Sequence, residues 1–119
     1  MEQLYREEIL EHYKHPRNYG EIRNPSFSVS DTNPICGDEI KITANIKGGV
    51  IKDIKFNGSG CALVTASASL LTNYLKGKRL DQLKKIDDKL ALKLLGGQIT
   101  PARISCALLP LKALKKIGS

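Results

Sequence analysis

The chain has 119 residues, of which 41% are hydrophobic and 26% are charged. This is the composition of an ordinary globular protein, long enough to bury a single hydrophobic core, and we expect one domain over residues 1–119. No run of about 18 apolar residues offers a transmembrane helix, so we expect no membrane association. The acidic, amphipathic start "MEQLYREEIL" does not resemble a secretory signal, which favours the cytoplasm.

The chain is basic, with 19 lysines and arginines against 12 acidic residues and a formal net charge of +7. A basic surface can bind nucleic acid. Here, however, the lysines stand beside leucines at helical spacing, as in "LKGKRLDQLKK" and "LKALKKIGS", and aromatic residues make up only 5% of the chain. We therefore expect no nucleic-acid partner, but a solvated basic surface of which a part meets an acidic protein.

The first half of the sequence predicts one helix followed by three strands. A helical pattern extends from Glu2 to about Tyr13, and "KHPRNYG" ends it. Its apolar stripe consists of Leu4, Tyr5, Ile9, Leu10 and Tyr13. Apolar and polar residues then alternate in "SFSVSD" and in "EIKITANIKGGVIKDIKF", and the pair Gly48-Gly49 divides the second run. We expect three antiparallel strands with one clear hairpin among them.

The second half of the sequence predicts helices. After "NGSG" the period of the apolar residues changes, and "ALVTASASLLTNYLKG" has the pattern of a helix of small residues and leucines that Gly77 closes. Two shorter helices are predicted at "LDQLKKI" and "DKLALKLLG", and a last helix from about Ser105 to Ile117. The two halves together predict an α+β fold with a three-stranded antiparallel sheet.

Three cysteines fall at the expected ends of these elements. Cys36 lies in the loop between the first two strands, Cys61 between the third strand and the next helix, and Cys106 near the start of the last helix. Their odd number argues against a disulfide framework and for reduced thiols, which serve as metal ligands or nucleophiles. A helix N-terminus favours the thiolate form of Cys61 and Cys106. The spacing matches no zinc finger, so any common site must be assembled by the fold.

The residues around the cysteines leave two interpretations open. A lone cysteine is usually a small buried hydrophobic residue, whereas the glycine-flanked "CGD" and "GSGC" place two of these thiols in polar, flexible backbone. Asp38, two residues after Cys36, is either a carboxylate ligand on the same loop or a turn former at the start of a strand. The histidines His12 and His15 are expected at the surface or facing a partner.

Several segments together resemble a known family. "NPICGD", "GSGCALVTASASLLT" followed by "LKGKRLDQL", and "PARISCALLPLKAL" are similar to the three cysteine signatures of the U-type iron–sulfur cluster assembly scaffolds, the family of IscU, SufU and the N-terminal domain of NifU. The opening "LYREEILEHYKHPRNYG" is similar to that family's first helix and basic-proline turn. The resemblance implies that helices pack on one face of the sheet, and that Cys36, Cys61 and Cys106 meet at one exposed end.

The resemblance implies a scaffold and not an enzyme. On such a scaffold, iron and sulfur from a cysteine desulfurase form a transient 2Fe–2S cluster, which then passes to apo-protein acceptors. The implied ligands are Cys36, Asp38, Cys61 and Cys106. Three thiolates with one carboxylate oxygen hold a cluster less durably than four thiolates, and this suits a protein that must release its product.

An alternative function uses the same four residues. In it the protein binds zinc, takes a persulfide sulfur from the desulfurase on Cys106 and hands that sulfur on without building a cluster. Zinc favours four-coordinate sites rich in thiolates, so zinc in the apo form is compatible with both functions. A third interpretation, a purely structural zinc domain, is disfavoured by the glycine-rich loops around the thiols.

The sequence departs from the family pattern in three places. Ser105 stands where the IscU branch has a histidine before the third cysteine, so that potential ligand is missing. "LGGQITPAR" does not match the "LPPVK"-type segment that binds an Hsp70 chaperone. The stretch between Cys61 and Cys106 is also shorter than in SufU-like proteins, so the chain combines features of several branches.

The missing histidine ligand affects the expected oligomeric state. A chain with fewer ligands of its own can complete a cluster site by sharing it, so we expect a monomeric apo form and a holo form that dimerises across the cluster. The basic turn from His15 to Arg17 is expected to face the desulfurase, because opposite charge steers association. The last helix is expected to do the same through Lys112, Lys115 and Lys116.

Overall fold

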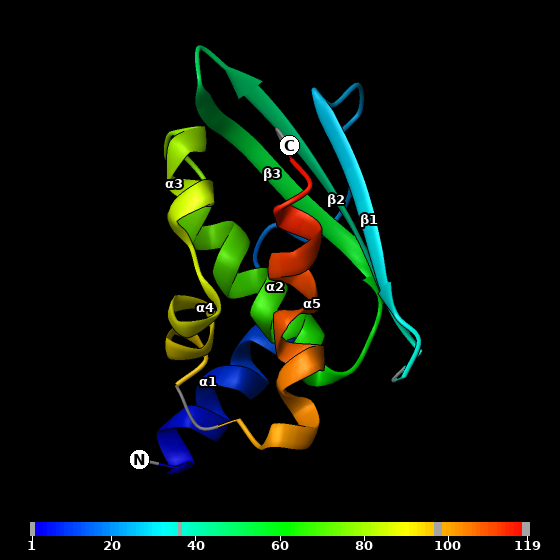
Figure 1. Ribbon diagram of the computed structural model, residues 1–119, viewed down its shortest axis with the longest axis vertical. Helices are drawn as coiled ribbons and strands as arrows, with labels where there is room; N and C mark the ends of the chain where they lie inside the picture. The colour runs from blue at the N-terminus through cyan, green and yellow to red at the C-terminus, as the bar shows by residue number, and fades with distance from the viewer. Residues whose placement is uncertain (1, 36, 97–98, 118–119) are drawn as a thin grey trace.

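The secondary structure follows the α+β order expected from the sequence. The computed structural model describes residues 2–35, 37–96 and 99–117, the first five of them by their backbone alone. The elements in chain order are α1 (Glu2–Lys14), β1 (Phe27–Asn33), β2 (Asp38–Lys47), β3 (Val50–Ser59), α2 (Ala62–Leu75), α3 (Leu80–Lys85), α4 (Asp88–Leu94), the 3₁₀ turn η1 (Pro101–Arg103) and α5 (Ile104–Leu114) (Figure 1). Among the residues described, no helix is long and apolar enough to cross a membrane.

The three strands form one antiparallel sheet in the order β1-β2-β3, as predicted. Ile42 in the central strand lies opposite Val29 of β1 and Phe56 of β3. At the predicted hairpin turn, Gly48 and Gly49 have φ angles of 60° and 75°, and a tight two-residue hairpin needs such positive φ angles. The turn thereby sets the register that brings the isoleucines of β2 and β3 to one face of the sheet.

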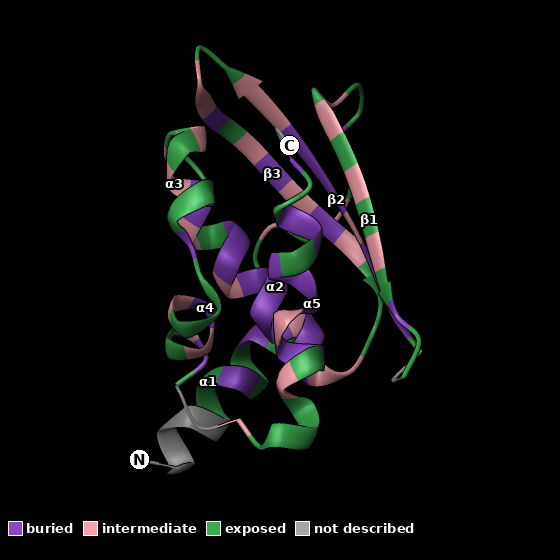
Figure 2. Ribbon diagram, viewed as in Figure 1, coloured by how far each residue is buried: buried purple, intermediate pink, exposed green. Residues whose placement is uncertain are grey.

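Helices α2 and α5 pack on that face, so the expected layering is confirmed (Figure 2). The two helices approach closely because α2 is rich in small residues. Ser67 is fully buried and its Oγ donates a 2.7 Å hydrogen bond to the carbonyl of Ala107 in α5. The largest buried side chains of this core include Ile42, Ile51, Ile54, Leu71, Leu75 and Leu114. Each contributes roughly 1.5–3 kcal/mol on burial, and together they fix the N-terminal ends of α2 and α5 relative to the sheet.

Helix α1 forms as predicted, but only part of its apolar stripe is buried. Ile9 is buried, whereas Leu10 and Tyr13 are 42% and 47% exposed. Leu4 and Tyr5 of the stripe lie outside the described side chains. Helix α1 packs against α2. This packing combines apolar contacts with a polar contact between side chains of the two helices.

That polar contact involves His12, which is buried and not at the surface as expected. Its Nδ1 lies 2.7 Å from Oγ of Ser69 in α2. The same hydroxyl oxygen accepts a 2.8 Å hydrogen bond from the backbone N–H of Arg17. His15 is exposed, in agreement with its prediction. The contact therefore attaches both α1 and the turn that follows it to α2.

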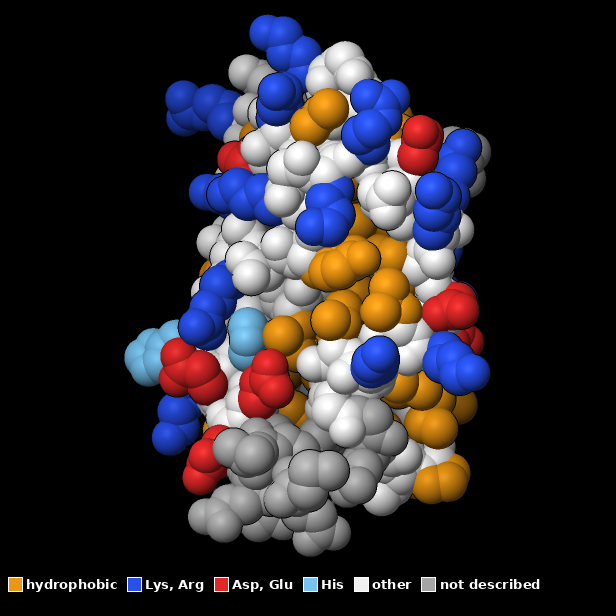
Figure 3. Space-filling view, turned by 90° about the vertical axis from the view of Figure 1, so that its left-hand side faces the viewer, with side chains coloured by type: hydrophobic (Ala, Val, Ile, Leu, Met, Phe, Trp, Pro, Cys, Tyr) orange, Lys and Arg blue, Asp and Glu red, His pale blue; other side chains and the backbone are white. Residues whose placement is uncertain are grey.

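The surface carries its charge unevenly. Figure 3 shows lysine and arginine side chains over the upper half of one face, with most of the acidic side chains and the histidines in the lower half. Hydrophobic side chains are exposed at the centre of this face and toward its lower right. Part of the surface is thus basic, as the net charge of +7 leads one to expect.

The buried His12 makes stability depend on pH. Burial lowers the pKa of His12 from its ordinary value of 6.5, and the charge of Arg17 lowers it further, while Glu8 and Glu11 act in the opposite direction. The unfolded chain therefore takes up this proton at a higher pH than the folded protein, and the free energy of unfolding falls as the pH drops below 6.5. We expect His12→Asn, which keeps a nitrogen near the position of Nδ1, to lose this part of the pH dependence.

Urea unfolding of both proteins at about pH 7 and at about pH 5 measures the effect. The loss of unfolding free energy between the two pH values should be smaller for His12→Asn than for the wild type. Equal losses in the two proteins would show that His12 does not contribute to the pH dependence.

Candidate metal centre

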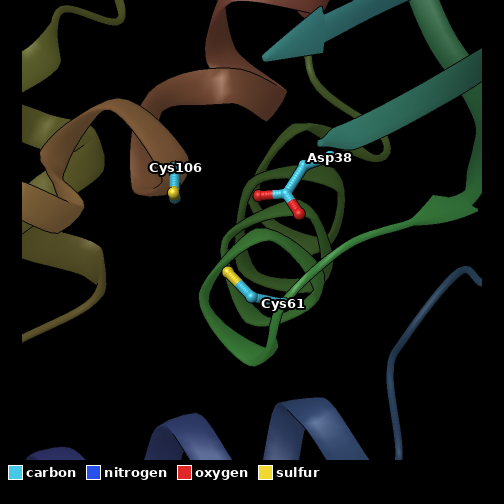
Figure 4. Close-up of side chains that lie close together, drawn as sticks. All are labelled: Asp38, Cys61 and Cys106. Carbon is cyan, nitrogen blue, oxygen red and sulfur yellow. The ribbon is translucent and has the colours of Figure 1, made fainter. Parts of the chain in front are cut away.

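Three potential ligands, each at the end of a different element, converge at one end of the sheet. Asp38 is the first residue of β2, Cys61 immediately precedes α2, and Cys106 lies in the first turn of α5. One carboxylate oxygen of Asp38 and the Sγ atoms of both cysteines all lie within 4.8 Å of one another (Figure 4). In the part of the chain that the structure describes, no other three metal-binding side chains meet in this way. The fold therefore brings together residues that are far apart in the sequence.

The backbone before α2 places Cys61 at the N-terminus of this helix. A Cβ atom at Gly60 would lie 3.0 Å from the side chain of Val64, so the chain passes close to the helix at a position that favours glycine. Cys61 is the N-cap residue in an extended conformation, and its side chain makes no capping hydrogen bond. Its thiol is thus available to a ligand.

The burial of Asp38 is the clearest indication of a bound cation. This side chain is only 6% exposed, and its Oδ2 has no hydrogen-bond partner among the described residues. A buried polar atom without a partner costs about 1–3 kcal/mol, and more if it is charged. Such an atom in a native protein calls for an explanation, of which a bound metal ion is one. Gly37 before it has a φ of 72°, which lets the chain turn and enter β2 directly at Asp38.

The donor set fits a thiophilic metal. Tetrahedral zinc holds two thiolates about 3.8 Å apart, a spacing compatible with ligand atoms that all lie within 4.8 Å of one another. Thiolates are also the usual ligands of iron–sulfur clusters. Cys106 is buried and Cys61 is half-buried, so the site is shielded by the fold and still accessible from the side of Cys61.

Asn33 connects the loop after β1 to the start of α5, a role that the sequence analysis missed. Its Nδ2 donates a 3.2 Å hydrogen bond to Oγ of Ser105, and its Oδ1 accepts one of 3.1 Å from the N–H of Ile35. Its carbonyl accepts a 2.8 Å hydrogen bond from the N–H of Gly37. One buried residue thus joins the turn before β2 to the residue that precedes Cys106. The only signal in the sequence is the Asn-Pro pair, which is typical of turn initiation.

The remaining predicted site residues have different outcomes. Cys36 lies outside the described residues, and its role as a ligand stays a prediction. Ser105, at the position of the missing histidine, is exposed and accepts the hydrogen bond from Asn33. His12 and His15 do not belong to the group of potential ligands. Asp38, Cys61 and Cys106 are therefore the members of the predicted set whose placement is known.

Comparison with known sequences connects this geometry to cluster assembly proteins. A family model described as the NifU-like N-terminal domain matches residues 4–117. The chain is similar to the zinc-dependent sulfurtransferase SufU of Bacillus subtilis, with 41% identity over 133 aligned positions that cover 98% of this chain and 90% of SufU. It is also similar to the iron–sulfur cluster assembly scaffold protein IscU of Escherichia coli, with 34% identity over 115 positions that cover 93% of this chain and 88% of IscU.

A solved structure supports the same assignment of the fold. The crystal structure of FiSufU from the thermophile Fervidobacterium islandicum AW-1 is similar to this one, with a TM-score of 0.80 and 27% sequence identity. The match covers 92% of this chain and 93% of FiSufU. The alignment with the Bacillus SufU is longer than this chain of 119 residues. SufU therefore carries insertions relative to this chain, as expected for a compact member.

Asn33 provides a test of how the site is positioned. We expect Asn33→Ala to weaken zinc binding by about 10–100-fold, the usual cost of removing a residue that orients metal ligands. The physical reason is that the turn before Asp38 and the start of α5 lose the hydrogen bonds that join them. Competition with a chromophoric zinc chelator measures the affinity.

The control for this variant is Asn73→Ala, because Asn73 is an exposed asparagine of α2 outside the candidate site. Circular dichroism should show the same helix content in both variants. If Asn33→Ala binds zinc as tightly as Asn73→Ala does, Asn33 has no role in positioning the ligands.

Proposed function

Because this chain belongs to the NifU-like N-terminal domain family, we propose that it is a scaffold on which a 2Fe–2S cluster is assembled and from which the cluster passes to apo-proteins. One observation carries the proposal. Asp38 has a carboxylate oxygen within 4.8 Å of two cysteine thiols, and its buried Oδ2 has no hydrogen-bond partner among the described residues. Iron and desulfurase-derived sulfur are the substrates of such a site, and the cluster is its product.

The proposed ligands are Cys36, Asp38, Cys61 and Cys106. The three thiolates match the preference of iron in clusters, whereas the harder carboxylate oxygen is the weaker ligand. A mixed set of this kind supports both assembly and release, because the bond to Asp38 is the easiest to exchange. The partial exposure of Cys61 supports access by a partner protein to the same site.

The partners follow from this chemistry. A cysteine desulfurase supplies sulfur, and apo iron–sulfur proteins receive the cluster; nucleic acid has no part. We propose that the apo protein is monomeric and that the loaded form dimerises across the cluster. Thiol ligands need a reducing compartment, and this supports a cytoplasmic location. The protein is a scaffold in this proposal and not an enzyme.

A second candidate function is that of a zinc-bound sulfur acceptor. The close spacing of Asp38, Cys61 and Cys106 favours it, because one ion needs all its ligands around a single centre, while a two-iron cluster distributes them over two. In this function the thiolate of Cys106 attacks the outer sulfur of the desulfurase persulfide. A new S–S bond forms on Cys106, the S–S bond of the desulfurase breaks, and its cysteine leaves as a thiolate. Cys106 is 5% exposed, so the desulfurase must displace part of the surrounding wall.

Anaerobic reconstitution distinguishes the two functions. The protein is incubated with ferrous iron, cysteine, the desulfurase and a reductant that supplies the electrons needed to turn persulfide sulfur into sulfide, and then with an apo-ferredoxin. A scaffold should show cluster absorbance that passes to the ferredoxin. Cys36→Ser, Cys61→Ser and Cys106→Ser should each lose the cluster, because a hydroxyl is a poor substitute for a thiolate, while Ser59→Ala, an exposed change at the end of β3, should retain it.

Two other outcomes would contradict the scaffold function or the assignment of a ligand. Persulfide on a cysteine, detected by mass spectrometry, without any iron–sulfur absorbance would favour the zinc-bound sulfur acceptor. A cluster that survives in one of the cysteine variants would remove that cysteine from the ligand set.

Asp38 is expected to control release. If its oxygen is the exchangeable ligand, Asp38→Ala should hold the cluster longer and transfer it to apo-ferredoxin more slowly, by about tenfold or more, the scale of a ligand or outer-shell change. The metal-free variant should also unfold no more easily than the wild type, because a buried oxygen without a partner has been removed.

Glu39→Ala is the matched control, since Glu39 is the next residue of β2 and is exposed. Transfer is followed by the absorbance or circular dichroism of the ferredoxin product. An Asp38→Ala rate equal to that of Glu39→Ala would reduce Asp38 to a residue of the turn.

A further inference from the structure

A groove of about 1030 Å³ lies beside the candidate metal centre and does not belong to it. Three segments form it: residues 32–35 after β1, residues 84–89 between α3 and α4, and α5 from Ser105 to Lys115. None of Asp38, Cys61 and Cys106 lines the groove, but it reaches the centre through Asn33 and Ser105. Its shape is therefore set by residues other than the described ligands.

The rim of the groove is basic. Five lysines line it against two aspartates. One of the lysines, Lys115, is held by the carbonyls of Leu83 and Lys84 at 3.1 and 3.2 Å, and one aspartate, Asp87, accepts a hydrogen bond from the N–H of Leu90 as the cap of α4. The other four lysines are exposed and make no ion pair within the described part of the chain: Lys84, Lys85, Lys89 and Lys112.

The floor and one end of the groove are apolar. Ile86, Leu109 and Leu111 are buried side chains of the core that also line it, and Leu108 is half-buried. Ile35, which directly precedes Cys36 in the sequence, also lines the groove and is 87% exposed. A large apolar side chain so exposed, beside unpaired cations, is typical of a surface that another protein covers.

The size of the groove excludes the smallest ligands. Pockets for small molecules reach about 1,000 Å³ at the upper end of their range, and a single metal ion or inorganic anion needs far less. An apolar floor with cations along the rim is complementary to a peptide segment that has an apolar side chain between carboxylates. The charges thus identify the occupant as an acidic segment of a protein.

We propose that this groove docks an acidic segment of the cysteine desulfurase, with an apolar side chain of that segment against Ile35. The inference rests on the proposed function, which supplies this partner. Sulfur delivery precedes the cluster, so the desulfurase must recognise the protein before anything is assembled. A groove whose described walls contain none of the described ligands offers such a surface, because none of these walls has to bind the cluster. A cluster acceptor, in contrast, has to distinguish the loaded protein from the empty one.

Docking here also makes contact with the ligand loop. Ile35 directly precedes Cys36 in the sequence, and its N–H is held by Asn33. A partner that packs on Ile35 therefore acts on the same turn that leads to Asp38. Of the residues predicted to face the desulfurase, Lys112 and Lys115 line the groove, whereas Lys116 and the basic turn from His15 to Arg17 do not.

Matched charge reversals test the groove. Lys85→Glu combined with Lys112→Glu reverses two rim charges, and Lys47→Glu combined with Lys52→Glu makes the same change in net charge on β2 and β3, outside the groove. We expect the first pair to weaken desulfurase binding, measured by calorimetry, by about tenfold or more relative to the second. The affinity of the wild type should fall from about 50 to about 300 mM salt, and the groove variant should lose most of this dependence.

A pair of substitutions at exposed apolar residues tests the proposed contact of the docked segment with Ile35. Ile35→Ser should weaken the same binding by about tenfold, whereas Leu10→Ser, at another exposed apolar residue, should not. Cluster formation from iron and inorganic sulfide, without desulfurase, should be equal in the wild type and all these variants.

The results separate this proposal from the function on which it rests. If the wild type builds no cluster from iron and sulfide, the proposed scaffold function fails. If it does, but the groove variants bind the desulfurase as the controls do, the docking site is wrong. Loss of transfer to apo-ferredoxin with unchanged desulfurase binding would assign the groove to the acceptor and overturn the proposal.

Discussion

The structure depends on one costly arrangement, the buried carboxylate of Asp38 at the point where β2 begins. Its buried Oδ2 has no hydrogen-bond partner among the residues that the structure describes, and a buried oxygen without a partner destabilises the folded state. The hydrophobic packing of α2 and α5 on the sheet offsets this cost and holds two thiols beside the carboxylate. The same packing that stabilises the fold thus places a buried carboxylate beside two thiols, an arrangement that a bound cation would stabilise.

Local order in this protein could be predicted from the sequence, because it depends on periodicity and turn residues. The alternation in β2 and β3 with Gly48-Gly49 between them gave the hairpin, and the position of each cysteine at the end of an element was correct where the structure describes it. Side-chain contacts between distant elements could not be predicted in the same way. The burial of His12 against Ser69, and the bridge from Asn33 to Ser105, depend on how α1 and α5 pack, and no local pattern encodes that packing.

The candidate site could also not be predicted fully from the sequence, because it depends on contacts between distant elements. Spacing alone left Asp38 open as a ligand or a turn former, and only the tertiary structure shows its oxygen within 4.8 Å of Cys61 and Cys106. Membership of the family narrowed the chemistry to metal and sulfur, but its members include both a scaffold and a zinc-dependent sulfurtransferase among the similar proteins. A donor set of thiolates with one oxygen suits either function, because zinc and iron share a preference for thiolates and differ in how many metal ions the ligands surround.

In the proposed site, one carboxylate and three thiolates form a single ligand set. X-ray absorption spectroscopy of the zinc-loaded protein tests this ligand set most directly, since it counts the donor atoms. We expect three sulfur ligands at about 2.3 Å and one oxygen at about 2.0 Å, with the carboxylate oxygen lost in Asp38→Ala. A shell of four sulfur atoms, or a spectrum that the removal of Asp38 leaves unchanged, would contradict it.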